Sequence, residues 1–341
     1  MTASFDILHT AMIARVEKRE LPGMAAVIAR DGGLLWWLAD RRVLRRIDGP
    51  LDDTYPASRP ITVEDLLTLR MGSGMIIEPT FDPPFPIVEE ARKLRLLAGA
   101  PGRDVPYEPD EWMRRFGSLP LMCQPGERWQ YNTGSLVLGV LVARAAAQPL
   151  EEFLRTRLLE PLDMRDTGFT LPAGGADRLP SQYTTDLQTG KVRPHADTGA
   201  DVWTRPPIFP SGAGGLLSTA DDFLSFAGLL LDGGVHRGRR LLSERSVEKM
   251  TTSHLTAEQI AGGGVLLSGS GWGFGMAVTV APDGVSPAPG RYGWAGGYGT
   301  TWFNDPHRRL IAIGLTQTDG FLWNGLGEFQ ELVARAADDM G

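Results

Sequence analysis

The chain has 341 residues, a formal net charge of −7 and a hydrophobic fraction of 42%. This length allows one large domain or two closely packed ones with a sizeable core. The mild acidity argues against nucleic acid and anionic membrane surfaces as partners. The single cysteine, Cys123, excludes an internal disulfide and is interpreted as a small buried hydrophobic residue.

The first 47 residues predict two helices around a hairpin. Charged and apolar side chains alternate as in an amphipathic helix over residues 3–20, which is unlike a secretion signal, and no apolar run is long enough to cross a membrane. We therefore expect a cytoplasmic protein. Residues 24–29 and 34–38 predict two strands joined by a turn at Asp31-Gly32, and residues 39–47 predict a helix with an arginine-rich, solvated face.

The middle of the chain predicts mostly helices. A capping residue, Thr62, and the acidic residues after it predict a helix start, and residues 135–148 are apolar nearly all round, which is typical of a buried helix. Thr133 or Ser135 is the expected cap of that helix, and Pro149 ends it. Further helices are expected over residues 88–97, 111–119, 150–159 and 219–231, with a loop over 48–60 and irregular chain over 165–210.

The C-terminal part predicts strands over residues 273–280, 300–303 and 310–316, with a turn at 304–307. A final helix over 327–338 should bury Phe329, Leu332, Val333 and Ala336 on one side. Strands at both ends and helices between them indicate an α+β fold. We expect residues 24–29 to pair with 310–316, so that residues 1–48 and 205–341 form a sheet domain and 49–204 a helical lobe.

Metal and phosphate chemistry have little support in this sequence. The histidines do not occur in a two-histidine helical spacing and there is no cysteine pair, so we expect no metal and no other cofactor. The glycine-rich segments 212–215 and 262–264 fit flexible turns better than phosphate loops. No serine has glycine at both −2 and +2, so the nucleophile elbow of the α/β-hydrolases is absent.

Five segments in chain order resemble one family. They are LLTLRMGSG at 66–74, WQYNTG at 129–134, EPLDMRDT at 160–167, GAGGLLSTAD at 212–221 and WAGG at 294–297. They are similar to the LLTHTSG, W-x-Y-S-N/T, EPLGMxDT, AGGLxSTAxD and Trp/His-x-Gly segments of the serine β-lactamase, penicillin-binding protein and class C-like esterase superfamily. The likeness is greatest to the family VIII carboxylesterase branch.

The resemblance implies a β-lactamase/transpeptidase-like fold and acyl transfer on small esters or amides. It implies that Tyr131 acts as the acid/base group, that Trp294 lines the substrate cleft, and that Gly297, with Gly296, supplies the backbone N–H of an oxyanion site. Asn132 or Thr133 is the corresponding substrate contact, set by the Tyr-Asn-Thr order of this sequence. In the family, a serine in a Ser-x-x-Lys motif attacks the carbonyl, and the lysine on the same helix face accepts its proton.

This chain lacks that motif at the expected place. Residues 31–53 contain no Ser, Thr, Cys, Tyr, Lys or His, and the only serine three residues before a lysine is Ser246, before Lys249. That pair lies downstream of Tyr131 in a segment of surface composition, and we interpret it as coincidence. We expect that the nucleophile helix has been deleted, which leaves marginal stability, exposed apolar surface and a tendency to self-associate.

Two functional hypotheses remain open. The first is an esterase-like acyl hydrolase that is inactive or severely impaired. The second is a non-catalytic member of the same fold that binds ligands or partners. A metal-dependent hydrolase is disfavoured by the histidine inventory.

Overall fold

The computed structural model describes residues 38, 40–76, 83–96, 105–186, 188–195 and 200–340. They belong to one compact unit, residues 37–341, and everything below concerns that unit. The predicted helix over 3–20, the strand over 24–29, the turn at Asp31-Gly32 and nearly all of the strand over 34–38 lie outside the described residues. The pairing of 24–29 with 310–316 lies outside them as well, and the predicted domain division stays a prediction.

The described sheet has five antiparallel strands, in the order β11-β10-β9-β8-β7. The strands are β7 (Gly271–Trp272), β8 (Ala277–Val278), β9 (Tyr292–Gly296), β10 (Thr300–Asp305) and β11 (Leu310–Leu315). The predicted strands at 300–303 and 310–316 are confirmed. The prediction of one strand over 273–280 is wrong, because the chain reverses between β7 and β8 at Gly275, whose φ is +86°.

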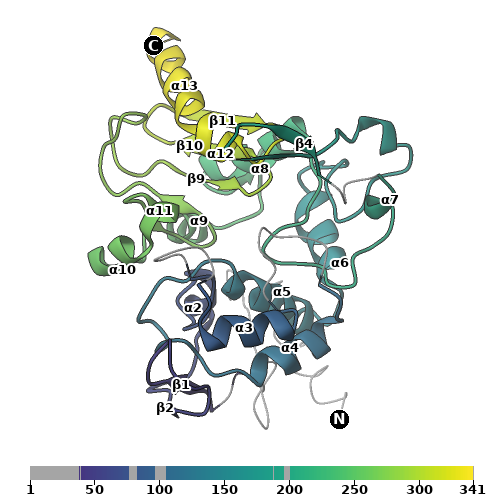
Figure 1. Ribbon diagram of the computed structural model, residues 1–341. Coiled ribbons are helices and arrows are strands. Elements are labelled where there is room, and N and C mark those ends of the chain that lie inside the picture. Colours follow the sequence, from purple (N-terminus) through teal and green to yellow (C-terminus); the bar gives the residue numbers. More distant parts are fainter. Residues whose placement is uncertain are drawn as a thin grey trace, which may run out of the picture. The chain divides into compact units, whose positions relative to one another are not determined.

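Helix α8 (Ala220–Leu231) packs against β10 and β11, as Figure 1 shows. Thr219 caps it by accepting a hydrogen bond from the Asp222 N–H. Between helix and sheet, the buried amide of Asn304 donates to the Ala227 carbonyl at 2.8 Å and to the Tyr292 hydroxyl at 3.0 Å. A buried amide is costly without partners. The bond to Ala227 therefore fixes α8 on the sheet, and the bond to Tyr292 joins β10 to β9.

The C-terminal helix α13 (Leu326–Met340) buries a different face from the one predicted. Phe329 and Val333 are half-buried as expected, but Leu332 is 54% exposed and Ala336 is exposed, whereas Ala334 is buried. The predicted helix is therefore confirmed, but its buried face is rotated by a fraction of a turn from the predicted face. A one-turn helix, α12 (Phe321–Asn324), precedes it.

The helices of the central part are close to those that the sequence predicts. They are α2 (Val63–Leu67), α3 (Pro86–Lys93), α4 (Pro109–Gly117), α5 (Thr133–Ala145) and α6 (Leu150–Leu154), the last continued by a π-helical turn at Arg155–Leu159. Helix α5 packs against both α2 and α6 (Figure 1). The capping box at Thr62 is present. The N-cap of α5 is Asn132 and has no side-chain hydrogen bond, so the prediction of Thr133 or Ser135 as cap is wrong.

The helix predicted over residues 39–47 is wrong. Strand β1 (Arg42–Leu44) pairs there with β2 (Thr54–Pro56), inside the predicted loop. The opposite edge of β1 exchanges backbone hydrogen bonds with Leu121, and Val43 is fully buried. These partners are distant in sequence, so a local helical pattern could not reveal them. Arg41 is likewise buried, not solvated, and donates to the carbonyls of Gly117 and Leu119.

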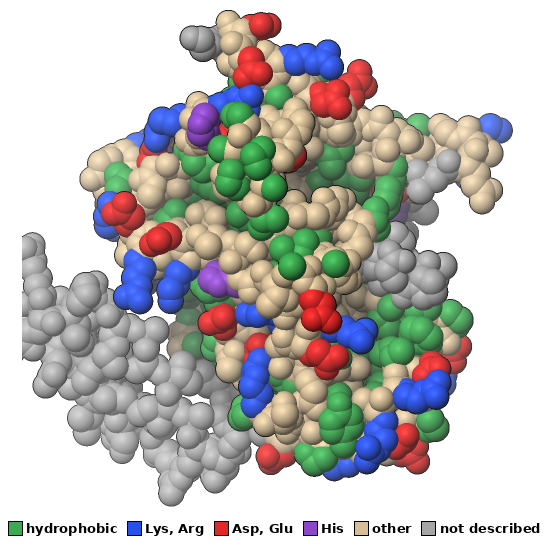
Figure 2. Space-filling view, turned by 90° about the vertical axis from the view of Figure 1, so that its left-hand side faces the viewer, with side chains coloured by type: hydrophobic (Ala, Val, Ile, Leu, Met, Phe, Trp, Pro, Cys, Tyr) green, Lys and Arg blue, Asp and Glu red, His purple; other side chains and the backbone are tan. Residues whose placement is uncertain are grey.

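Short elements complete the description. Residues 165–210, predicted as irregular, contain a 3-10 turn (Ala176–Arg178), the hairpin β3 (Tyr183–Thr185) and β4 (Val192–Pro194), and α7 (Ala200–Trp203). After α8 come β5 (Val235–His236), β6 (Arg239–Arg240), α9 (Glu244–Met250), α10 (Ala257–Gly262) and α11 (Gly264–Leu267). On the face drawn in Figure 2, basic and acidic side chains are interspersed among the described residues.

Within the described part of the chain, no individual helix has both the length and the hydropathy that a membrane crossing needs. The strongly bent pair Thr133–Ala145 and Leu150–Leu159 meets that test together, by length and composition only.

Candidate active site

The structure brings Tyr131 and Trp294 into direct contact. Tyr131 lies on the loop immediately before α5, and Trp294 lies in the middle of β9. The Trp294 Nε1–H donates to the Tyr131 hydroxyl oxygen at 2.8 Å, and the ring centroids are 5.3 Å apart. Two residues that the family resemblance assigns to one site are thus in contact, while their chemical roles remain predictions.

Three backbone hydrogen bonds fix the chain around Tyr131. Its carbonyl accepts from the Met75 N–H, and the N–H of Gln130 donates to the Leu69 carbonyl at 2.8 Å. The same Tyr131 carbonyl accepts from the Thr133 N–H at 3.0 Å, across Asn132 with φ 77° and ψ −56°. This is a γ-turn of the rare positive-φ kind, which is strained. Such strain persists only where the surroundings enforce it, and it is frequent at active sites.

Asn132 and Thr133 themselves are buried, with 7% and 3% of their surfaces exposed. The sequence interpretation gives one of them a substrate contact, and that role stays a prediction. What the structure establishes is their backbone position, in the turn that connects Tyr131 to α5.

Three tryptophans surround Tyr131. Trp129 and Trp272 lie 5.8 Å and 6.4 Å from its ring, and Trp272 also makes an edge contact with Trp294 at 4.8 Å. Leu69 and Leu267 pack against the same group, which we call the tryptophan cluster: Trp129, Tyr131, Trp272 and Trp294. The indole nitrogens of Trp129 and Trp272 are buried and have no hydrogen-bond partner among the described residues. The cluster is therefore an apolar surrounding for the Tyr131 hydroxyl.

Burial raises the pKa of Tyr131 above that of an exposed tyrosine, and the hydrogen bond from Trp294 only partly offsets it. A tyrosine accepts a proton efficiently only as the phenolate, and a nearby cation is the usual means of lowering its pKa. Among the described residues no cation contributes to the Tyr131 pKa. Its hydroxyl therefore stays protonated at neutral pH.

Gly296 and Gly297 lie where β9 turns into β10. The turn closes with a hydrogen bond from the Gly299 N–H to the Gly296 carbonyl at 3.0 Å. Gly299 has φ +84°, and a Cβ there would lie 1.8 Å from the Thr318 carbonyl oxygen, so only glycine fits. The Thr316 hydroxyl donates to the Gly299 carbonyl at 2.6 Å. The turn that contains Gly297 is thus held by the residues that follow β11, and the oxyanion role of Gly297 stays a prediction.

Two residues at the site were missed in the sequence. Trp272 belongs to a short strand whose partner could not be identified locally. Gln259 in α10 donates from Nε2 to the Gly126 carbonyl at 2.7 Å, which ties α10 to the Tyr131 loop. The Thr256-x-x-Gln259 capping box was readable as a helix start, but its contact lies 133 residues away.

The formal Ser-x-x-Lys match lies on the surface. Ser246 and Lys249 are exposed on α9, and the Ser246 hydroxyl shares a hydrogen bond with that of Ser243 at 2.7 Å. This agrees with the interpretation as coincidence. Cys123 is buried, and burial raises the pKa of its thiol to about 12, so the reactive thiolate is scarce. No group of three or more metal-ligating side chains occurs within the described ranges.

Comparison with known proteins shows which family and which proteins this chain resembles. The family profile described as "Beta-lactamase" matches residues 37–334. Protein Rv1367c of Mycobacterium tuberculosis is 37% identical over 285 residues, covering 81% of this chain and 67% of the relative. Esterase EstB of Burkholderia gladioli is 27% identical over 366 residues, covering 89% and 88%. Lovastatin esterase of Penicillium rubens is 27% identical over 295 residues, covering 79% and 67%.

Solved structures share the fold. EstCE1, described as a hydrolase with promiscuous acyltransferase activity, superposes with a TM-score of 0.67 at 21% identity, covering 96% of this chain and 81% of the other. Unliganded simvastatin synthase from Aspergillus terreus gives 0.68 at 18% identity, covering 95% and 80%. The predicted β-lactamase/transpeptidase-like α+β fold is therefore confirmed. The deletion of a nucleophile helix stays a prediction.

Proposed function

Because the chain belongs to the beta-lactamase family, we propose that it carries an esterase-type acyl-transfer site that keeps its acid/base tyrosine but has lost its nucleophile. The observation that carries the proposal is the direct contact between Tyr131 and Trp294 in a chain whose only Ser-x-x-Lys match lies on the surface of α9. The names of the esterases among its relatives point to a small ester as the ligand of this site.

The chemistry of acyl transfer explains why turnover should be lost. A nucleophile must attack the ester carbonyl, and a base must take its proton. Tyr131 is protonated at neutral pH, and its oxygen already accepts a hydrogen bond from Trp294. Gly297, in the tight turn after β9, could still polarise a carbonyl through its N–H, which supports binding of an ester without its cleavage.

The second candidate is a member of the same fold that only binds small esters, amides or partners. The strained, rigidly held Asn132 turn favours a retained site of some kind, since strain costs about 1–3 kcal/mol and persists where function needs it. Both candidates predict binding without efficient turnover. They differ in residual hydrolysis, which the first predicts to depend on Tyr131.

The test is p-nitrophenyl butyrate hydrolysis, in steady state and by stopped flow. Loss of nucleophile and base together removes on the order of 10⁶ in kcat, while remaining groups retain roughly 10³–10⁴ over water. We expect no burst, and residual hydrolysis that falls in Tyr131→Phe but not in Ser246→Ala. A kcat in the ordinary range of about 1–10³ s⁻¹ would refute the proposal.

We also propose that the protein self-associates through apolar surface, because the proposed loss of a nucleophile helix would leave part of the core uncovered. Sedimentation velocity at increasing protein concentration tests this directly. A single monomeric species over about a hundredfold range of concentration would contradict it.

A further inference from the structure

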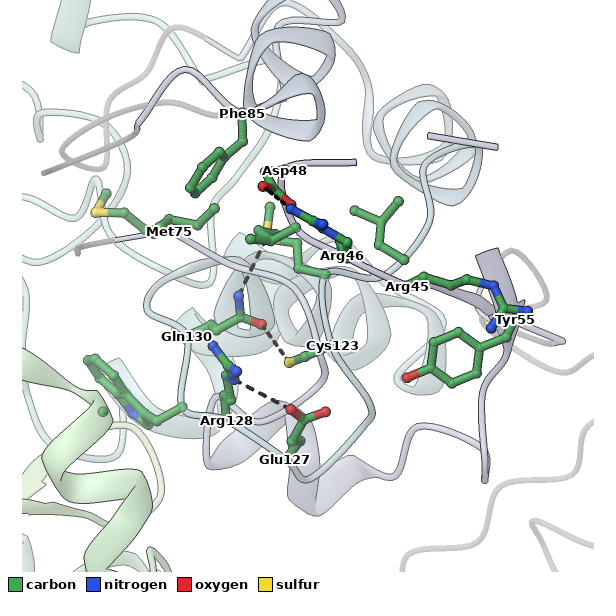
Figure 3. Close-up of a pocket in the computed structure, with 16 residues that line it drawn as sticks. Arg45, Arg46, Asp48, Tyr55, Met75, Phe85, Cys123, Glu127, Arg128 and Gln130 are labelled. Carbon is green, nitrogen blue, oxygen red and sulfur yellow. Dashed lines mark hydrogen bonds and ion pairs between the residues drawn. The ribbon is translucent and has the colours of Figure 1, made fainter. Parts of the chain in front are cut away.

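A cavity of about 500 Å³ lies beside the tryptophan cluster and shares Trp129 with it. Its described walls come from the chain around β1, from residues 75–76, from the start of α3 and from residues 122–130 (Figure 3). This volume is within the roughly 300–1,000 Å³ of small-molecule sites. The walls combine polar and apolar side chains, and Leu44, Met75, Phe85 and Met122 form the apolar part used below.

One polar group in these walls has strong hydrogen-bonding capacity left unused. Among the described residues, the Gln130 Nε2 donates to the Met122 sulfur alone, at 3.4 Å, and its Oε1 accepts from the Cys123 thiol alone, at 3.4 Å. A thioether is a weak acceptor and a thiol a weak donor. An amide that faces such partners gains from any ligand that offers a strong acceptor, because poorly satisfied polar groups are costly away from water.

Charged side chains of both signs also line the cavity, namely Arg45, Arg46 and Arg128 together with Asp48 and Glu127. Arg46 is occupied by two short bonds to Asp48, and Arg45 is paired with Asp53 at 3.1 Å.

Arg128 has a weaker partner. It touches Glu127 only at 3.4 Å, and 71% of its side chain is exposed. It lies two residues from Gln130, in the same wall (Figure 3). An anionic ligand would therefore meet a largely exposed guanidinium with one long ion pair, next to an amide whose two partners are sulfur atoms.

We propose that this cavity binds a small monocarboxylate with an apolar body, in the class of a medium-chain fatty acid. The carboxylate accepts hydrogen bonds from Gln130 Nε2 and from the Arg128 guanidinium, and the alkyl chain lies along Leu44, Met75 and Phe85. A charged acceptor strengthens both bonds relative to a neutral one. The site adjoins the tryptophan cluster, but the binding proposed here does not depend on acyl-transfer chemistry.

The experiment compares octanoate, octylammonium and 1-octanol by isothermal titration calorimetry, with Trp fluorescence as a second signal. We expect octanoate to bind at least tenfold more tightly than either of the others, since one charge-assisted hydrogen bond is worth roughly a factor of ten or more. Equal binding of octanoate and 1-octanol would overturn the proposal. So would the absence of saturable octanoate binding up to about 10 mM.

Two matched pairs of variants locate the site. Gln130→Leu and Arg128→Gln should each weaken octanoate binding about tenfold or more. The controls are Gln188→Leu and Arg165→Gln, which alter exposed side chains that do not line the cavity and should leave binding unchanged. Equal effects in the site variants and their controls would contradict the assignment.

The wild-type protein gives an independent readout if a variant does not fold. Residues of the segment 122–130 form one wall of the cavity. Saturating octanoate should slow hydrogen–deuterium exchange in the peptides that cover this segment, and octylammonium should not. Exchange that octanoate leaves unchanged there would place the ligand elsewhere and overturn the proposal.

Discussion

The hydroxyl of Tyr131 accepts a hydrogen bond from the indole N–H of Trp294 at 2.8 Å, across 163 residues of sequence. This bond joins the loop before α5 to the central strand β9, so it connects the helical part of the site to the sheet. Each partner is the residue at which the chain resembles a family motif, and the contact explains why both motifs occur in one chain.

Removing the Tyr131 hydroxyl should destabilise the protein. Tyr131→Phe leaves the half-buried Trp294 N–H without its acceptor, and we expect the free energy of unfolding to fall by about 1–2 kcal/mol in urea. Tyr107→Phe is the control, because the ring of Tyr107 keeps its contact with Arg115 at 4.1 Å and the change should stay under about 0.5 kcal/mol. Equal decreases in the free energy of unfolding in both variants would show that the Trp294–Tyr131 hydrogen bond does not stabilise the fold.

Alkaline pH should weaken the fold. Burial raises the pKa of both Tyr131 and Tyr292 in the folded state, whereas the pKa of an unfolded tyrosine is about 10. The folded state thus holds its phenol protons more tightly, so this stability is fully present below about pH 10 and is lost as pH rises through the folded pKa values. Unfolding free energies at about pH 9 and 11 should differ less in Tyr131→Phe than in the wild type. An equal difference would be inconsistent with a raised Tyr131 pKa.

Two helical glycines should respond oppositely to alanine. A Cβ at Gly139 in α5 would lie 2.8 Å from the backbone nitrogen of Gly212, so Gly139→Ala forces two backbone segments apart and should cost about 1–3 kcal/mol. Gly228 in α8 has open space around it, and Gly228→Ala should stabilise by about 0.5–1 kcal/mol. Thermal unfolding measures both. Stabilisation by Gly139→Ala would contradict the close packing of α5 against the Gly212 segment.

Acid should release the anchor at the start of α2. The buried carboxylate of Asp65 accepts from Thr62 and, at 2.6 Å and 2.8 Å, from Arg59. Burial alone would raise the pKa of Asp65, but these bonds outweigh it and the pKa is lowered. The stability that these bonds supply is therefore present above the unfolded-state pKa of Asp65, about 3.9. It is lost as pH falls through the pKa of Asp65 in the folded state.

The variant Asp65→Asn should cost about 1–3 kcal/mol at neutral pH and little at low pH. Asp166→Asn is the matched control. It breaks a bidentate pair with Arg178 in which the side chains of Arg178 and Asp166 are 58% and 33% exposed, so its cost should stay below about 1 kcal/mol. A cost of Asp65→Asn that does not depend on pH would argue against the ion pair.

Sequence alone predicted the elements whose pattern is local. Helix α5 was recognisable because its residues are apolar nearly all round. Helix α2 was recognisable because its capping box lies within four consecutive residues. Strands β10 and β11 were evident from two apolar runs around a turn. In each case the signal and the structure involve the same few residues.

The remaining features depend on distant partners. Strand β1 exists because Leu121 and Thr54–Pro56 bond its two edges, and neither partner can be read from residues 39–47. Trp272 and Gln259 reach the Tyr131 loop from more than a hundred residues away. Tyr131 and Trp294 were found through their family resemblance, since nothing in the periodicity of either segment indicates that the two side chains meet.

The most direct test of the central claim, that this chain keeps the tyrosine of an acyl-transfer site without a nucleophile, is the intact mass of the protein after treatment with a fluorophosphonate probe. A serine esterase treated in parallel controls for probe reactivity. The account predicts an unchanged mass, because the only Ser-x-x-Lys match in the sequence begins at Ser246, which is an exposed hydroxyl bonded to Ser243. A stoichiometric adduct that maps to one serine would contradict it.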